Sequence, residues 1–177
     1  EWRYPFIRQH EGWHEVVEPI AQVIAGTDTG NSGNIPNEDS LDIEFDETNL
    51  FDLNRFAGLD RVDTGQRVNY GLRWSLYGDE GGFASIFLGQ SYSFNDTNNF
   101  DSGSGLDTHM SDIVGAVYLN PADYLDLMYR FRLDADSFQE IGALATHDCT
   151  DFGMADQRYP GDGVVCGFGK IHGRRVA

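Results

Sequence analysis

The most constraining feature of this sequence is a strict alternation of apolar and polar residues between positions 66 and 76. Apolar side chains occupy every second position from Val68 to Leu76, and polar or small residues lie between them. Period-2 alternation is typical of a β-strand with one apolar and one polar face. Residues 78–82 are rich in glycine, which accepts the positive φ of a tight turn, and a second run follows from Phe83 to Phe94. The pattern therefore predicts a β-hairpin.

The two strands of this hairpin are longer than the ordinary globular strand of about 5–6 residues. A strand that crosses a bilayer needs about 9–11 residues. The same kind of alternation predicts four more strands, at 2–7, 14–25, 112–120 and 124–134. Pro5 interrupts the first of these, because proline cannot donate a hydrogen bond to a neighbouring strand. We expect about six strands in all.

The connections between these strands are sorted by length. Residues 10–13, 78–82 and 121–123 form short connections, whereas residues 26–65 and 95–111 form long polar ones. In an antiparallel order, all short connections then lie at one end of the sheet and all long ones at the other. This asymmetry is typical of an up-and-down transmembrane β-barrel with short periplasmic turns and long extracellular loops. We predict an all-β, antiparallel barrel fragment, since closed barrels begin at about eight strands.

The polar faces of the predicted strands carry charged side chains. Arginine would be costly in a dry core but suits a hydrated lumen. The residues that we expect to face such a lumen are Glu18, Gln22, Arg67, Asn69, Arg73, Arg130 and Arg132. In the long connection, the apolar residues between Leu41 and Asp60 predict a segment that packs onto the sheet. A soluble, acidic β-sandwich that binds sugar or calcium is the alternative from a different class.

The charge of the chain limits its partners. The formal net charge is −17, which argues against nucleic acid, because phosphate neutralisation needs clustered Lys and Arg. Much of the acid lies in or beside the first long connection, where we expect a solvated loop; a divalent-cation site is the second interpretation. These acidic residues are Asp28, Glu38, Asp39, Asp42, Glu44, Asp46, Glu47, Asp52, Asp60 and Asp63. We expect neither a cofactor nor enzymatic activity, because no Ser lies in a nucleophile elbow.

The last segment, residues 139–177, differs from the rest in composition. It contains both cysteines and the only lysine, and it lacks sustained alternation. This segment has three possible interpretations: a divergent natural end, a small module of another kind, or a frame-shifted and possibly disordered end. We favour the last. His147, Cys149, Cys166 and His172 match no usual zinc spacing, so we interpret them as a coincidence. A disulfide between the two cysteines stays open.

Short motifs in the first 138 residues resemble one known family. They include Trp2-Arg3-Tyr4-Pro5-Phe6, Glu18-Pro19-Ile20-Ala21-Gln22, Ile35-Pro36-Asn37-Glu38-Asp39-Ser40, Asn49-Leu50-Phe51, Arg55-Phe56, Gly58-Leu59-Asp60-Arg61, Gly89-Gln90-Ser91-Tyr92, Ser104-Gly105-Leu106, Ser111-Asp112 and Arg130-Phe131-Arg132-Leu133-Asp134. In this order they resemble the barrel domain of the lipopolysaccharide-assembly protein family LptD (also OstA or Imp), in its alphaproteobacterial form. Residues 1–138 would then be a partial barrel.

The resemblance implies a function in the outer membrane of a Gram-negative bacterium. In that family a large barrel, plugged by a lipoprotein called LptE, inserts lipopolysaccharide (LPS) into the outer leaflet. The implied partners are LPS, an LptE-like plug, outer-membrane lipid and, through an N-terminal domain without counterpart here, the periplasmic Lpt bridge. An outer-membrane porin or receptor fragment is the alternative within membranes.

The resemblance also marks candidate residues in the first long loop. They are Asn37, Glu38, Asp39, Asn49, Leu50, Phe51, Gly58, Asp60 and Arg61. For Gly58 to Arg61 we expect a loop that folds over the barrel mouth with local pairing of Asp60 and Arg61. Contact of Arg61 with a lipid phosphate is the alternative, since guanidinium matches phosphate geometry.

Overall fold

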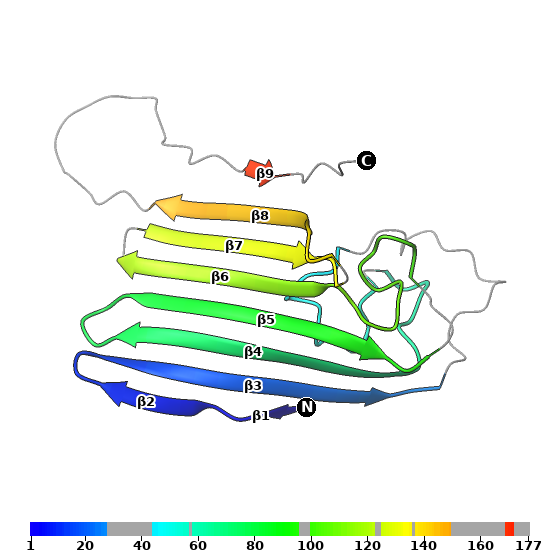
Figure 1. The fold of residues 1–177 in the computed structure, drawn as a ribbon, viewed down its shortest axis with the longest axis horizontal. Helices are drawn as coiled ribbons and strands as arrows, with labels where there is room; N and C mark the ends of the chain where they lie inside the picture. The colour runs from blue at the N-terminus through cyan, green and yellow to red at the C-terminus, as the bar shows by residue number, and fades with distance from the viewer. Residues whose placement is uncertain are drawn as a thin grey trace.

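The computed structural model describes residues 1–27, 44–56, 58–95, 100–122, 125–135, 137–149 and 169–171. These residues form one antiparallel sheet (Figure 1). Its strands are β1 (Trp2–Arg3), β2 (Phe6–His10), β3 (Trp13–Ala25), β4 (Gln66–Gly78), β5 (Phe83–Ser93), β6 (Ile113–Ala122), β7 (Leu125–Leu133), β8 (Glu140–Cys149) and β9 (Gly169–Ile171). The expected all-β, antiparallel fold is confirmed.

The strand order follows the chain from β3 to β9, and β1 and β2 share the free edge of β3. The sheet is open. No helix among the described residues is long and apolar enough to span a membrane. The expected count of about six differs at both ends: Pro5 splits the first strand, and two strands form after residue 139, where alternation is weak.

Up to β7, the connections are sorted as the sequence predicts. Short turns join β2 to β3 and β4 to β5 at the left in Figure 1, and the described parts of the long β3–β4 and β5–β6 connections lie at the right. The connection between β7 and β8 is an exception, because it is short and also lies at the right. In the β4–β5 turn, Gly81 and Gly82 have φ of 110° and 87°, which only glycine adopts readily. This turn therefore needs glycine at both positions.

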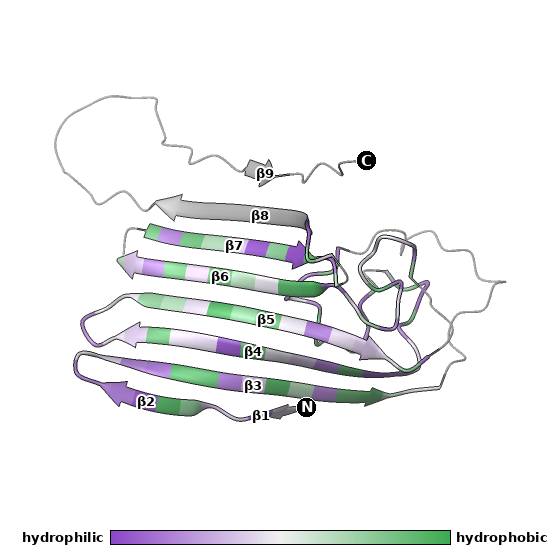
Figure 2. Ribbon diagram, in the orientation of Figure 1, coloured by the Kyte–Doolittle hydropathy of each residue, from purple (hydrophilic) through white to green (hydrophobic). Residues whose placement is uncertain are grey.

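One face of the sheet, here called the outer face, is apolar and uncovered. Register places Val17 opposite Trp74, Trp74 opposite Ile86, and Leu72 opposite Leu88, so these side chains share one face. Leu72 and Leu88 are 48% and 44% exposed, which is unusual for apolar residues in the middle of a sheet. The alternating bands along the strands in Figure 2 reflect this division between faces.

The opposite face, here called the inner face, carries the core. Ile20, Phe87 and Val114 project from β3, β5 and β6, and Phe45 and Leu50 cover them from the first long connection. Leu106, from the second long connection, completes the cluster. The prediction that the segment between Leu41 and Asp60 packs onto the sheet is confirmed for Phe45, Leu50 and Phe51, whereas Leu53 and Leu59 are 71% and 93% exposed.

Candidate functional site: the covered inner face

Register brings the expected lumen residues to the inner face. Glu18 lies opposite Arg73, and Gln22 lies opposite Asn69. Arg130 is opposite Ala116, which in turn is opposite Phe87 of the same face. All seven candidates (Glu18, Gln22, Arg67, Asn69, Arg73, Arg130 and Arg132) therefore point to one side of the sheet.

Their surroundings differ from the expected open, hydrated lumen. Arg67, Asn69 and Gln22 are only 2%, 0% and 6% exposed, because the long loops cover them. Glu18 and Arg73, nearer the short turns, keep side-chain exposures of 21% and 45%. The inner face thus has a covered end and an accessible end.

The covered end contains a chain of polar side chains that runs across three strands. Asn69 donates from Nδ2 to Oε1 of Gln22 over 2.8 Å, and Ser91 Oγ donates to Oδ1 of Asn69 over 2.7 Å. Gln22 Nε2 donates to the carbonyl of Phe51 over 2.9 Å. Each buried amide thus has a partner, as buried polar groups require.

Residues 44–53, here called the strap, cross the inner face from β7 to β1. Glu47 forms an ion pair with Arg130 of β7 at 2.6 Å and accepts a hydrogen bond from the Tyr118 hydroxyl of β6 over 3.1 Å. At the other end, the guanidinium of Arg3 in β1 lies over the ring of Phe51 at 5.8 Å. The strap therefore contacts β6 and β7 on one side of the sheet and β1 on the other.

Two glycines make room for side chains on the inner face, Gly89 for Leu50 of the strap and Gly71 for the ring of Phe87. Gly71 and Gly89 are directly opposite in β4 and β5. A Cβ at Gly89 would lie 2.4 Å from Cδ2 of Leu50, and a Cβ at Gly71 would lie 2.8 Å from the ring of Phe87. Only residues without a side chain allow this approach, which explains the glycines within these strands.

The second long connection, between β5 and β6, is also held to the sheet by an arginine of β7. Arg132 of β7 lies 3.4 Å from the carboxylate of Asp112 and donates from Nη1 to the carbonyl of Ser104 over 3.0 Å. Burial raises the pKa of Asp112, and the neighbouring Arg132 opposes this. Burial likewise raises the pKa of Glu47 in the strap more than Arg130 lowers it. Both carboxylates are therefore removed from water.

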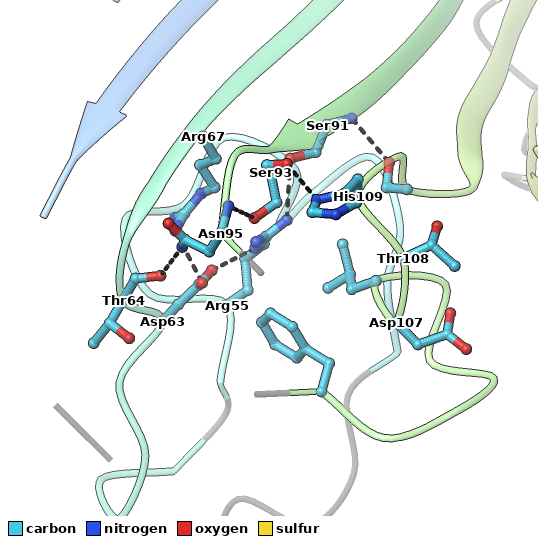
Figure 3. Close-up of a pocket in the computed structure, with 13 residues that line it drawn as sticks. Arg55, Asp63, Thr64, Arg67, Ser91, Ser93, Asn95, Asp107, Thr108 and His109 are labelled. Carbon is cyan, nitrogen blue, oxygen red and sulfur yellow. Dashed lines mark hydrogen bonds and ion pairs between the residues drawn. The ribbon is translucent and has the colours of Figure 1, made fainter. Parts of the chain in front are cut away.

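A polar cavity of about 110 Å³ lies between the two loops, at the long-loop end of β4 and β5 (Figure 3). Asp63 lies between two guanidinium groups, 2.5 Å from Nε of Arg55 and 2.9 Å from Nη1 of Arg67. These three side chains are 4%, 4% and 2% exposed, in the same order. The guanidinium of Arg55 also lies 5.1 Å from the centre of the Phe100 ring.

Sequence reasoning missed this ion-pair triad. Asp63 was expected in a solvated acidic loop, and that expectation is wrong for Asp63 and for Glu47, because both carboxylates are buried against arginines. The only local signal was the spacing of four residues between Asp63 and Arg67. Arg55 lies too far along the chain for spacing to show the contact.

The family-motif residues fall into three groups. Asn49 donates from Nδ2 to the carbonyl of Glu44 over 2.8 Å, Leu50 is fully buried, and Phe51 packs on the core, so these three shape and anchor the strap. The carbonyl of Arg61 accepts a hydrogen bond from Asn54, whereas the function of Gly58, Asp60 and Arg61 in lipid contact stays a prediction. Asn37, Glu38 and Asp39 lie outside the described residues.

The described part of the chain contains no candidate metal site. There, no group of three His, Cys, Asp or Glu side chains could hold an ion. Cys166 and His172 lie outside the described residues, as do the side chains of His147 and Cys149.

Comparison with known proteins separates the two ends of the chain. The pattern of the carboxyl transferase domain family matches residues 129–177. The propionyl-CoA carboxylase beta chain of Roseobacter denitrificans is 57% identical over 44 residues, which are 25% of this chain and 9% of that protein. The mitochondrial beta chain of Homo sapiens is 50% identical over 46 residues, 25% of this chain and 8% of that protein. The chain thus spans less than a tenth of these curated relatives.

The larger match covers the sheet and its loops. The pattern of the LptD family, described as LPS transport system D, matches residues 1–146. These residues include β1 to β7, the strap and the cavity, and they make up well over half of the chain. The chain therefore belongs to the LptD family of the LPS transport system.

Proposed function

We propose that this chain is part of the wall of an outer-membrane β-barrel that places LPS in the outer leaflet. In this proposal the outer face contacts membrane lipid and the inner face lines the barrel interior. The short turns lie on the periplasmic side, and the long loops close the extracellular mouth. The alphaproteobacterial type and the fragmentary character of the barrel domain are part of the same proposal.

The observation that carries this proposal is the two-faced single sheet of a chain in the LptD family. The outer face has exposed Leu72 and Leu88, and all three tryptophans (Trp2, Trp13 and Trp74) share it through the register of β1, β3 and β4. Tryptophan is enriched at membrane–water interfaces. A β-sandwich would need a second sheet over this face, and the described residues form only one sheet.

The partners follow from the family. We propose LPS as cargo, outer-membrane lipid around the outer face, an LptE-like plug against the accessible inner face, and Lpt bridge components on the periplasmic side. Transport rather than catalysis is the proposed activity. The carboxyl transferase likeness concerns a quarter of the chain and less than a tenth of the relatives, so it gives weaker support to an enzyme.

Photo-crosslinking of two neighbouring positions tests this proposal. A photoreactive amino acid replaces Arg73 on the inner face or, as the matched control, Leu72 on the outer face; the two side chains have similar exposure. Each full-length variant is reconstituted in phospholipid vesicles, and labelled LPS is added. We expect LPS adducts at position 73 and phospholipid adducts at position 72. The absence of LPS adducts at position 73, or equal LPS adducts at both positions, would contradict the proposed function.

A further inference from the structure

The cavity between the two long loops has the size and lining of a site for a small polar ligand. Its volume of about 110 Å³ corresponds to roughly three or four water molecules. Hydroxyl and charged side chains dominate the lining, including Thr64, Ser93 and Thr108 (Figure 3). The ring of Phe100 and the side chain of Leu106 add an apolar part. This composition suits a ligand that accepts several hydrogen bonds.

The charges within the buried triad of Arg55, Asp63 and Arg67 do not balance, although the cavity lining as a whole also contains Asp107. Arg55 and Arg67 share the single carboxylate of Asp63, so the buried triad has one positive charge in excess. Asp107 also lines the cavity, but its Oδ2 accepts hydrogen bonds from Ser102 Oγ and the Gly103 N–H. In Figure 3 its carboxylate points away from the two guanidinium groups. Because a buried charge is costly without compensation, the triad favours an added anion.

One guanidinium also has an unused donor. Nη2 of Arg67 donates to the carbonyls of Asp52 and Leu53, over 2.9 and 2.8 Å, and Nη1 faces Asp63. Nε of Arg67 is buried and has no hydrogen-bond partner in the described part of the chain. Unsatisfied buried donors are rare and costly, so an acceptor at this nitrogen would relieve a real penalty.

We propose that this cavity binds a small oxyanion of the phosphate class, either free phosphate or the phosphomonoester of a lipid. Arg55 and Arg67 supply the charge, since guanidinium groups match phosphate oxygens in geometry and charge. The hydroxyl of Ser93, which accepts the Asn95 N–H over 3.4 Å, supplies a neutral donor. The anion would hold the first long loop against β4 and β5, because Arg55 belongs to that loop and Arg67 and Ser93 belong to the two strands.

Substitution of the competing carboxylate gives the sharpest test. Asp63→Asn removes the internal anion and keeps the shape of the side chain, so it leaves two uncompensated arginines. The full-length chain is folded in detergent micelles, and thermal unfolding is followed by circular dichroism during titration with inorganic phosphate. Sodium chloride at matched ionic strength is the reference. We expect phosphate to raise the melting temperature of the unmodified chain, and to bind D63N about tenfold more tightly.

Two further variants separate an anion site from a structural triad. Asp79→Asn is the control for the removal of a carboxylate outside the cavity, because Asp79 lies in the β4–β5 turn and its side chain is 59% exposed; it should bind phosphate like the unmodified chain. Arg67→Gln should lose the phosphate-dependent shift. Calorimetric titration of the unmodified chain with phosphate decides the question even where D63N or R67Q fails to fold. No phosphate binding beyond that of chloride in the unmodified chain would overturn the proposal and leave the triad as a structural contact.

A second pair of probes distinguishes the source of the anion. Micelles that contain phosphatidic acid are compared with micelles that contain phosphatidylcholine. Stabilisation by both free phosphate and phosphatidic acid indicates a site open to lipid headgroups, and stabilisation by free phosphate alone indicates a closed ion site. The inference does not depend on LPS transport, so its failure would leave the crosslinking result at position 73 unaffected.

Discussion

At the residue scale, the inner face is a set of individual fits between the strap and the sheet. Leu50 is fully buried and lies against the backbone of Gly89, where any larger residue would collide with it. Glu47, Gln22 and Arg67 each connect a strand to a loop through a hydrogen bond or ion pair. The polar strand residues of the inner face therefore hold the loop on the sheet.

Leu50→Ala tests the apolar part of this attachment. Removal of a fully buried leucine side chain leaves a cavity, and we expect a loss of about 2–5 kcal/mol in the free energy of unfolding. Leu59→Ala is the matched control, because this leucine of the same loop is 93% exposed and its removal should change stability by less than about 0.5 kcal/mol. Denaturant titration in detergent micelles measures both variants. Equal effects would contradict the packing of the strap.

Glu47→Gln tests the electrostatic part. Burial raises the pKa of Glu47 above 4.5, so the folded chain binds its proton more tightly than the unfolded chain. The stability from this group is therefore full below pH 4.5 and decreases as the pH rises through the raised pKa. Arg130, Tyr118 and Asp46 are the charged or titratable groups that surround the carboxylate.

We expect the free energy of unfolding of the unmodified chain to fall relative to that of E47Q as the pH rises above 4.5. Unfolding measured at a series of pH values checks this slope. Asp112→Asn should show a slope of the same sign, because burial raises that pKa too. A difference that is independent of pH would contradict the burial of Glu47.

At the element scale, the sequence predicted strands well and loops poorly. Alternation located β3 to β7 within a few residues because each strand has one apolar face, and a period of two is visible locally. Pro5 marked the break between β1 and β2 for an equally local reason. β8 lacked this signal, and the structure pairs it with β7 in a register that shifts between Arg132 and Leu133.

The path of the strap could not be read from the sequence. Its contacts join residues far apart in the chain, such as Glu47 with Arg130 and Phe51 with Gln22. Periodicity carries no information about such long-range pairs. The same holds for the triad at the cavity, where Arg55 and Arg67 belong to a loop and a strand. The apolar residues of the loop indicated only that it packs, not what it covers.

At the scale of the whole molecule, the two ends of the chain are similar to different families. The LptD pattern ends at residue 146 and the carboxyl transferase pattern begins at residue 129, close to the change in composition near residue 139. The boundary at 138 and the origin of the tail stay predictions. The similarity of residues 129–177 to a second family is compatible with the hypothesis that the tail is a small module of another kind.

We propose that the outer face of this sheet contacts membrane lipid while the inner face does not. Tryptophan fluorescence tests it directly, because Trp74 lies on the outer face in the middle of β4. Trp2→Phe and Trp13→Phe leave Trp74 as the single tryptophan. A second variant carries these two substitutions together with Trp74→Phe and Arg73→Trp, so that its single tryptophan lies on the inner face.

Both proteins are reconstituted in vesicles of brominated phospholipid, whose bromine atoms quench tryptophan only on contact. We expect strong quenching of Trp74 by the brominated lipid. The tryptophan at position 73 should be quenched weakly by the lipid and strongly by acrylamide in the water. Equal quenching at both positions, or quenching of Trp74 by acrylamide alone, would contradict a membrane-facing outer surface.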